Sequence, residues 1–151
     1  MWQICLEGLE NQFVEASKHI LLVDDEPDFL FSAGIALRKA GYRVHAAVSG
    51  KEALDRVLEA RNASEPFDLL VTDIRMPWMS GFELMDTLKL WGISIPLMAM
   101  TCFSDGELVG ELKTRGCVEL IEKPFTPDDL VSRVGHFLIR CAVSTVPGSA
   151  A

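Results

Sequence analysis

Carboxylate, hydroxyl and amine side chains stand at the ends of four separate apolar runs of this 151-residue chain. These side chains are Asp24 with Asp25, Asp73, Thr101 and Lys123. Each run is short and bounded by turn residues, as Pro66 and Pro77 bound the run before Asp73, so each is typical of a buried strand. Acidic oxygens, a hydroxyl and an ammonium group are the groups that bind metal ions and phosphate.

Strand-like and helix-like segments alternate along the chain. The expected strands are residues 19–23, 42–48, 67–71, 95–100 and 118–121, and the expected helices are residues 27–40, 49–61, 81–90, 106–114 and 126–140. Ser49 with Glu52 forms a capping box, Pro27 fits a first helical turn, and Gly41 fits a helix end. This alternation predicts an α/β fold with a doubly wound, five-stranded parallel sheet in the order 2-1-3-4-5.

The domain organisation follows from the same pattern. We expect one domain over residues 19–141, a flexible tail over residues 142–151, and an N-terminal extension over residues 1–18 that is helical because its apolar residues have helical spacing. The extension either packs on its own domain or presents an apolar stripe to a partner or an upstream segment. The residues after Arg140 are too few for an output domain, so the chain is a stand-alone protein or part of a longer one.

Composition excludes several classes of function. A formal net charge of -8 and a pI near 4.8 argue against direct binding to nucleic acid. No apolar run approaches the length of about 20 residues that crosses a bilayer, and no signal peptide is recognisable, so we expect a cytoplasmic protein without membrane contact. The scattered cysteines favour reduced thiols over disulfides or zinc, with Cys102 and Cys117 buried as small apolar residues.

The predicted strand order brings Asp24 and Asp25 beside Asp73, with Thr101 and Lys123 on the next two strands. Three adjacent carboxylates repel one another unless a cation lies among them, and all-oxygen ligands favour Mg²⁺. Lys123 then offers a point charge to a phosphoryl group or to Asp73, and Thr101 offers a hydroxyl donor. This set is suited to forming an acyl phosphate on Asp73, although each residue alone has a structural alternative, such as capping a helix.

The segments ILLVDDEPD, VTDIRMPWMSGFEL, PLMAMT and EKPF resemble those of the receiver domain of two-component response regulators, which has a flavodoxin-like fold. The resemblance spans about residues 19–140. It implies that Asp73 accepts a phosphoryl group from a sensor histidine kinase, a phosphotransfer protein or a small phosphodonor. It also implies that Asp25, Asp73 and the backbone carbonyl of Arg75 bind Mg²⁺, while Asp24 acts largely through water.

Further expectations follow from the resemblance. Thr101 and Lys123 contact the phosphoryl oxygens, and the Lys123–Pro124 peptide bond is cis. The chain is not an enzyme with a separate substrate, because it catalyses only its own phosphorylation and dephosphorylation. Output to a downstream protein passes through the surface of helix 106–114, strand 118–121 and helix 126–140, and a homodimer is possible.

Four positions depart from the usual receiver pattern, and one of them, Cys102, is larger than the glycine or alanine often found there. Leu120 stands where Tyr or Phe is usual, so the coupling between the Thr101 hydroxyl and an aromatic switch residue is in doubt. Arg75 and Phe103 occupy positions that tune hydrolysis of the acyl phosphate, and neither is a carboxylate or amide that orients a water molecule. We therefore expect a long-lived phosphorylated form.

Two other functions remain open. One is a receiver-like interaction module that works without phosphorylation. Leu120 and the apolar N-terminal stripe favour this alternative. The other is a Mg²⁺-dependent phosphohydrolase of the haloacid type. Such enzymes need a second Asp two residues after the nucleophile, where this chain has Arg75, so the phosphohydrolase is the weaker alternative.

Overall fold

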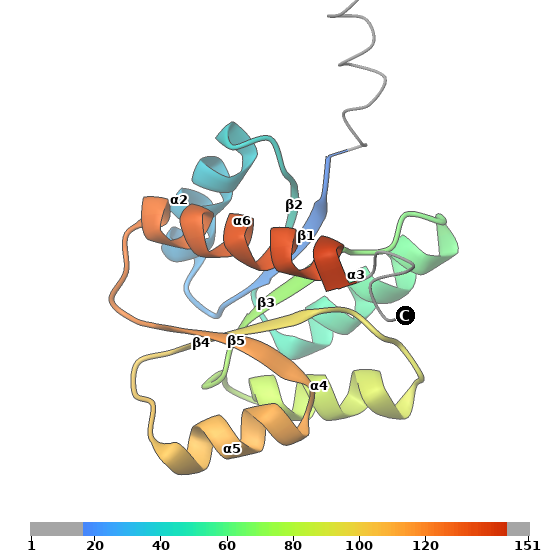
Figure 1. Cartoon of the computed structure of the whole chain (residues 1–151). Coiled ribbons are helices and arrows are strands. Elements are labelled where there is room, and N and C mark those ends of the chain that lie inside the picture. Colours follow the sequence, from blue (N-terminus) through green and yellow to red (C-terminus); the bar gives the residue numbers. More distant parts are fainter. Residues whose placement is uncertain (1–16, 145–151) are drawn as a thin grey trace, which may run out of the picture.

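The computed structural model describes residues 17–144 (Figure 1). Most of the predicted N-terminal extension, residues 1–16, and most of the predicted tail, residues 145–151, lie outside the described residues. Within residues 17–144, the structure contains no helix that is both long enough and apolar enough to cross a membrane.

Strands and helices alternate along the described chain, as predicted. They are β1 (His19–Val23), α2 (Pro27–Lys39), β2 (Arg43–Ala47), α3 (Gly50–Asn62), β3 (Leu69–Asp73), α4 (Gly81–Leu90), β4 (Leu97–Thr101), α5 (Gly106–Thr114), β5 (Cys117–Glu122) and α6 (Pro127–Ser144). All strand pairs are parallel, and the sheet order is β2-β1-β3-β4-β5. The predicted fold class and strand order are confirmed.

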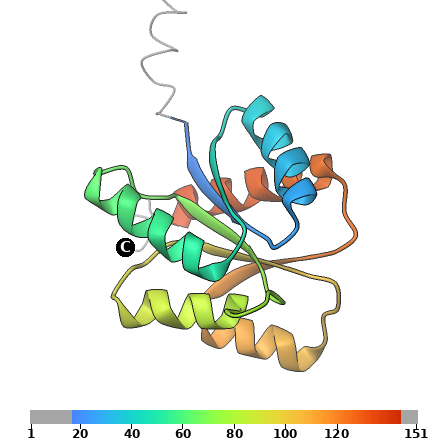
Figure 2. The ribbon, with the colours of Figure 1, turned by 180° about the vertical axis from the view of Figure 1, so that it is seen from behind.

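Helices cover both faces of the sheet (Figures 1 and 2). One core cluster joins the sheet to α2 and α6, and the other joins it to α3, α4 and α5. The central strands β1, β3 and β4 are buried along their whole length, which explains why they are almost uninterrupted apolar runs. The carboxyl ends of these strands are thereby held on a rigid base.

Polar side chains fix the starts of the helices next to the carboxyl edge of the sheet. The Ser49 hydroxyl accepts a hydrogen bond from the Glu52 amide at 3.1 Å, as the predicted capping box requires, but the Glu52 carboxylate accepts in return from the Val48 amide at 3.2 Å. Ser80 caps α4 in the same way, and a carboxylate oxygen of Asp105 accepts from the Leu108 amide at 2.8 Å at the start of α5. The loops that lead into these helices therefore have defined endpoints.

Besides shifts of one or two residues at other strand ends, the structure differs from the prediction in three local details. β3 runs two residues further than predicted and includes Asp73, because Asp73 pairs with Met100 of β4. α6 continues to Ser144, past the predicted end near Arg140. Cys117 is buried as expected, but the prediction for Cys102 was wrong: Cys102 is exposed because it lies after β4, in the loop to α5.

The first residue of α4 touches the backbone of β3. A Cβ atom placed on Gly81 would lie 2.5 Å from the carbonyl oxygen of Asp73 and 2.9 Å from the Cα of Ile74. Contacts this short with backbone atoms cannot be relieved by rotating a side chain. Only glycine therefore allows α4 to begin this close to Asp73.

We expect Gly81→Ala to lower the free energy of unfolding by about 1–3 kcal/mol, because the added methyl group overpacks a rigid contact. Gly110→Ala is the matched control. A Cβ on Gly110, inside α5, would meet nothing within 4 Å, so we expect it to raise stability by roughly 0.5–1 kcal/mol. Urea unfolding followed by circular dichroism measures both, and equal stability of Gly81→Ala and the wild type would contradict the close contact.

Candidate functional site

The five side chains singled out from the sequence lie at the carboxyl edge of the sheet. Asp24 and Asp25 directly follow β1, Asp73 ends β3, Thr101 ends β4, and Lys123 directly follows β5. The parallel register sets these ends level, since Val23 pairs with Thr72 and Asp73 pairs with Met100. The carboxyl edge is where open α/β sheets bind ligands, so the predicted convergence has the right location for a site.

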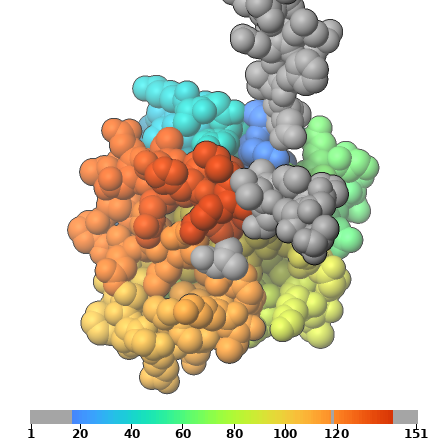
Figure 3. Space-filling view, in the orientation of Figure 1, coloured from blue at the N-terminus to red at the C-terminus, as the bar shows by residue number. Residues whose placement is uncertain are grey.

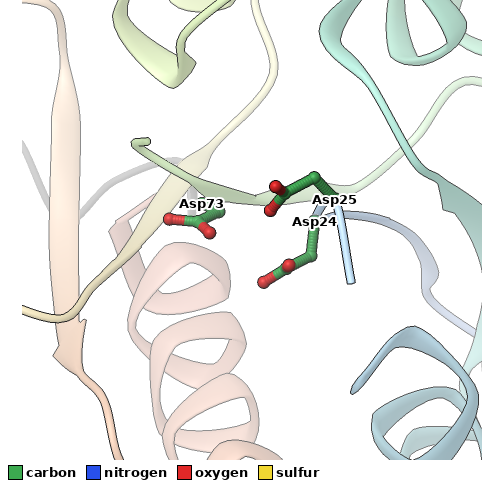
Figure 4. Close-up of side chains that lie close together, drawn as sticks. All are labelled: Asp24, Asp25 and Asp73. Atoms are coloured by element: carbon green, nitrogen blue, oxygen red, sulfur yellow. The ribbon is translucent and has the colours of Figure 1, made fainter. Parts of the chain in front are cut away.

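The side chains of Asp24, Asp25 and Asp73 lie close together (Figure 4). One carboxylate oxygen of each lies within 4.8 Å of those of the other two. Asp24 is fully buried, Asp73 is buried, and Asp25 is exposed at the mouth of the cluster. Oxygen ligands from three carboxylates suit a hard divalent cation, so the cluster has the composition of a metal site.

The ammonium group of Lys123 bridges two of the carboxylates. Its Nζ donates to Asp24 Oδ2 at 2.6 Å and to Asp73 Oδ2 at 3.3 Å. The Lys123 backbone amide donates to the Thr101 carbonyl at 2.7 Å, which fixes the strand end that carries the side chain. The Lys123–Pro124 peptide bond is cis, as expected.

Charge at the site is only partly balanced. One ammonium against three carboxylates leaves two excess negative charges when all three are ionised. Burial raises the pKa of Asp73, and the charge of Asp24 acts in the same direction, while Lys123 opposes both. Bringing a divalent cation to the cluster relieves this repulsion, which is why the residues present fit such an ion.

Lys123 keeps its proton at neutral pH. Burial by itself lowers the pKa of Lys123, but the hydrogen bond to Asp24 and the charges of Asp73 and Asp24 outweigh it, and the pKa is raised above its ordinary value. A lysine ordinarily titrates near pH 10.4, so a raised value leaves the side chain a fixed positive charge. The site therefore offers both anionic ligands and a permanent cation.

Backbone amides orient the two buried carboxylates. Asp24 Oδ1 accepts from the Glu26 amide at 2.9 Å, and Asp73 Oδ1 accepts from the Arg75 amide at 3.2 Å. Each carboxylate thus turns one oxygen toward its own loop and the other toward Lys123. These bonds hold the Asp73 carboxylate in one orientation, with one hydrogen bond to each of its oxygens.

The Thr101 hydroxyl is turned toward its own loop. Its Oγ1 donates to the Phe103 carbonyl at 2.9 Å and accepts from the Phe103 amide at 3.2 Å. Thr101 is buried and lines a cavity of about 650 Å³, together with Arg75, Phe82 and Phe103. The structure therefore brings Thr101 to the correct edge of the sheet but engages its hydroxyl with Phe103.

Two residues that shape the site were missed by sequence reasoning. Gly81 allows α4 to start against Asp73, but the sequence does not single it out, because α3 and α5 also begin with a glycine. The Phe29 ring centroid lies 4.9 Å from Lys123 Nζ, and Phe29 packs edge to face on Phe125. No pattern in the sequence distinguishes Phe29 from an ordinary core residue of α2.

Comparisons with known proteins agree with this geometry. The family model described as the response regulator receiver domain matches residues 20–135. The response regulator SaeR of Staphylococcus aureus strain USA300 is 31% identical over 122 residues, which make up 81% of this chain and 51% of SaeR. The chain thus spans about half the length of the curated relatives it matches.

Solved structures show the same fold. The chemotaxis protein CheY4 of Vibrio cholerae has a TM-score of 0.73 at 30% identity, covering 80% of this chain and 98% of its own. A receiver domain protein of Methanospirillum hungatei JF-1 has a TM-score of 0.73 at 29% identity, covering 85% and 98%. Strand order, site geometry and these similarities lead to one conclusion: the chain belongs to the response regulator receiver domain family of two-component systems.

Proposed function

We propose that this chain is a phosphorylation-driven switch in which Asp73 accepts a phosphoryl group from a sensor histidine kinase or a phosphotransfer protein. The observation that carries the proposal is the Lys123 ammonium between Asp24 and Asp73, beside the third carboxylate of Asp25. A buried carboxylate next to a fixed cation, open on one side, is suited to nucleophilic attack on phosphorus. We also propose that this activity takes place in the cytoplasm.

In the proposed reaction, a carboxylate oxygen of Asp73 forms a bond to phosphorus while the bond from phosphorus to the donor histidine nitrogen breaks. The electron pair stays on the imidazole nitrogen, which then binds a proton. Asp25, Asp73 and the backbone carbonyl of Arg75 would hold Mg²⁺, with Asp24 acting largely through water. When bound, the ion neutralises charge on the phosphoryl oxygens.

The other site residues assist the transfer. Lys123, already protonated, lies close enough to Asp73 Oδ2 to contact an oxygen of the phosphoryl group that forms there. Thr101 contacts a second oxygen after its hydroxyl turns away from Phe103. The chain acts on its own carboxylate in this scheme, so it is not an enzyme with a separate substrate.

Output to a downstream protein is proposed to use the surface of α5, β5 and α6. These elements lie side by side on the face seen in Figure 3, and both α5 and α6 pack on β5. Glu119 of β5 forms ion pairs with Arg133 and Arg140 of α6. The surface therefore carries charged side chains that can pair with those of a partner instead. A second copy of the chain is one candidate partner for it.

Leu120 is the feature that favours the alternative function, an interaction module that works without phosphate. It is half-buried against the core, and its carbonyl accepts from Arg133 Nη2 at 2.7 Å. Leucine has no ring or hydroxyl that moves between a wet and a buried position, so it does not supply the usual aromatic switch. Phosphorylation of Asp73 depends on none of these contacts and remains the leading proposal.

Incubation with acetyl phosphate and Mg²⁺ is expected to add the mass of one phosphoryl group, because the site itself performs the transfer. Asp73→Asn should abolish the addition, whereas Asp55→Asn, on the exposed face of α3, should leave it unchanged. Intact mass spectrometry measures the product. The phosphate-independent module would be favoured if the wild type stayed unmodified and its amide chemical shifts also did not change on addition of beryllofluoride and Mg²⁺.

Removing the Lys123 charge is expected to destabilise the fold. In Mg²⁺-free buffer, Lys123→Met should lower the free energy of unfolding by about 3 kcal/mol, because the fully buried Asp24 loses its ionic partner. Adding Asp24→Asn should recover most of the loss. The exposed Lys113→Met is the control and should change stability by less than about 0.5 kcal/mol. Urea unfolding measures the stability of each variant. If the double variant lost as much stability as Lys123→Met alone, this would argue against the pairing of Lys123 with Asp24.

The phosphorylated form is expected to be long-lived, decaying over minutes or longer, because Arg75 and Phe103 offer no group that orients a water molecule for attack. Arg75→Asn, and separately Phe103→Glu, should shorten its lifetime by supplying an amide or a carboxylate. Loss of the phosphorylated mass after removal of acetyl phosphate gives the rate. Decay of the wild type within seconds would contradict this expectation.

A further inference from the structure

The loop from β3 to α4 begins and ends at the phospho-acceptor. It leaves β3 after Asp73, and the Gly81 amide at its end donates to the Ile74 carbonyl at 2.8 Å. The backbone of Gly81 lies directly against Asp73, since a Cβ atom added to Gly81 would lie 2.5 Å from the Asp73 carbonyl oxygen. Residues 74–80 therefore form a closed loop at the rim of the site.

The tip of this loop is held in an uncommon turn. The Met79 amide donates to the Pro77 carbonyl at 2.8 Å, and Trp78 between them has a φ angle of +70°. This is a three-residue turn with its central residue in the left-handed region, a conformation that a bulky L-residue rarely adopts. The rest of the loop must therefore hold Trp78 in this conformation.

The flanking side chains anchor the loop and leave Trp78 outside. Met76 is buried in the core, and Met79 packs where Gly50 of α3 lacks a side chain, so that a Cβ on Gly50 would lie 2.6 Å from Met79 Sδ. Trp78, between these two anchors, is 99% exposed. The loop thus presents a complete indole ring to solvent, on a backbone segment that is anchored on both sides and directly follows β3.

Other large apolar side chains are exposed on neighbouring segments of the same rim. Phe103, in the loop after β4, is 62% exposed, and Phe31, in the second turn of α2 after β1, is 72% exposed. Exposed aromatic side chains therefore occur on three segments that leave the carboxyl edge of the sheet. Exposed aromatic residues close to a functional site are typical of surfaces that bind a protein partner.

We propose that Trp78 is the main anchor by which a protein phosphodonor docks over Asp73. The inference rests on the proposed function and deepens it. A phosphohistidine on a protein reaches the Asp73 carboxylate only if the donor's surface lies across the rim, which includes the closed loop and its exposed indole. A small phosphodonor enters the site without touching that ring, so Trp78 distinguishes the two kinds of donor.

The test compares Trp78→Asn with the wild type as acceptors from two donors. Asparagine accepts the left-handed conformation more readily than tryptophan, so the loop keeps its shape while the indole is lost. The protein donor is the autophosphorylated catalytic core of whichever histidine kinase, in a panel of purified kinases, phosphorylates the wild type fastest. The small donor is acetyl phosphate with Mg²⁺. Trp91→Asn, at the far end of α4, is the matched control.

We expect Trp78→Asn to lower kcat/KM for the kinase by about tenfold or more, mainly through KM, while the acetyl phosphate rate stays within about twofold. The Trp91 control should change neither rate. An unchanged kinase rate, an equal loss with both donors, or a wild type that accepts phosphate from acetyl phosphate but from no kinase would overturn the inference. So would loss of self-association in Trp78→Asn, since a second copy would then cover the ring. Failure of acetyl phosphate on the wild type would instead refute the proposed function.

Discussion

The ion pair between Lys123 and Asp24 is the interaction on which the site depends. The Asp24 carboxylate is fully buried, and an isolated charge there would be very costly. Lys123 at 2.6 Å and the Glu26 amide at 2.9 Å make this charge tolerable. The pair also joins the ends of β1 and β5, which β3 and β4 separate in the sheet, so it ties together segments 99 residues apart in sequence.

The topology explains why this charge cluster has an opening. β1 leads into α2 on one face of the sheet, and β3, beside it, leads into α4 on the other. The two connections diverge, and the space between them is the crevice at which doubly wound sheets bind ligands. Asp25 lies at this opening while Asp24 and Asp73 lie below it, which leaves the cluster accessible from solvent.

Sequence reasoning reached the elements, the strand order and the convergence of Asp24, Asp25, Asp73 and Lys123, because these follow from apolar runs, caps and the pairing rules of parallel sheets. It did not reach the features that depend on the reach and rotation of single side chains. Lys123 lies closer to Asp24 than to Asp73, which no pattern encodes. The left-handed turn at Trp78 likewise arises from packing of the neighbouring methionines and not from any turn preference of tryptophan.

The exposure of Cys102 illustrates the same limit at a strand end. A residue that follows an apolar run has no local signal for whether pairing continues, and here β4 stops at Thr101. Conversely, Asp73 was expected just outside its strand and lies inside it because β4 extends the pairing. Strand ends are decided by the neighbouring strand, which lies far away in sequence.

In the proposed switch, the two bonds between Thr101 and Phe103 oppose rotation of the Thr101 hydroxyl toward Asp73. A hydroxyl that rotates toward Asp73 gives up both, at a net cost of about 0.5–1.5 kcal/mol each. Their sum of about 1–3 kcal/mol leaves the rotated form in roughly one molecule in 6 to one in 160 before any phosphate arrives. Under the proposed function, the loop from Thr101 to Phe103 would thus disfavour the rotated form, and weakening this loop would increase its population without any change at Asp73.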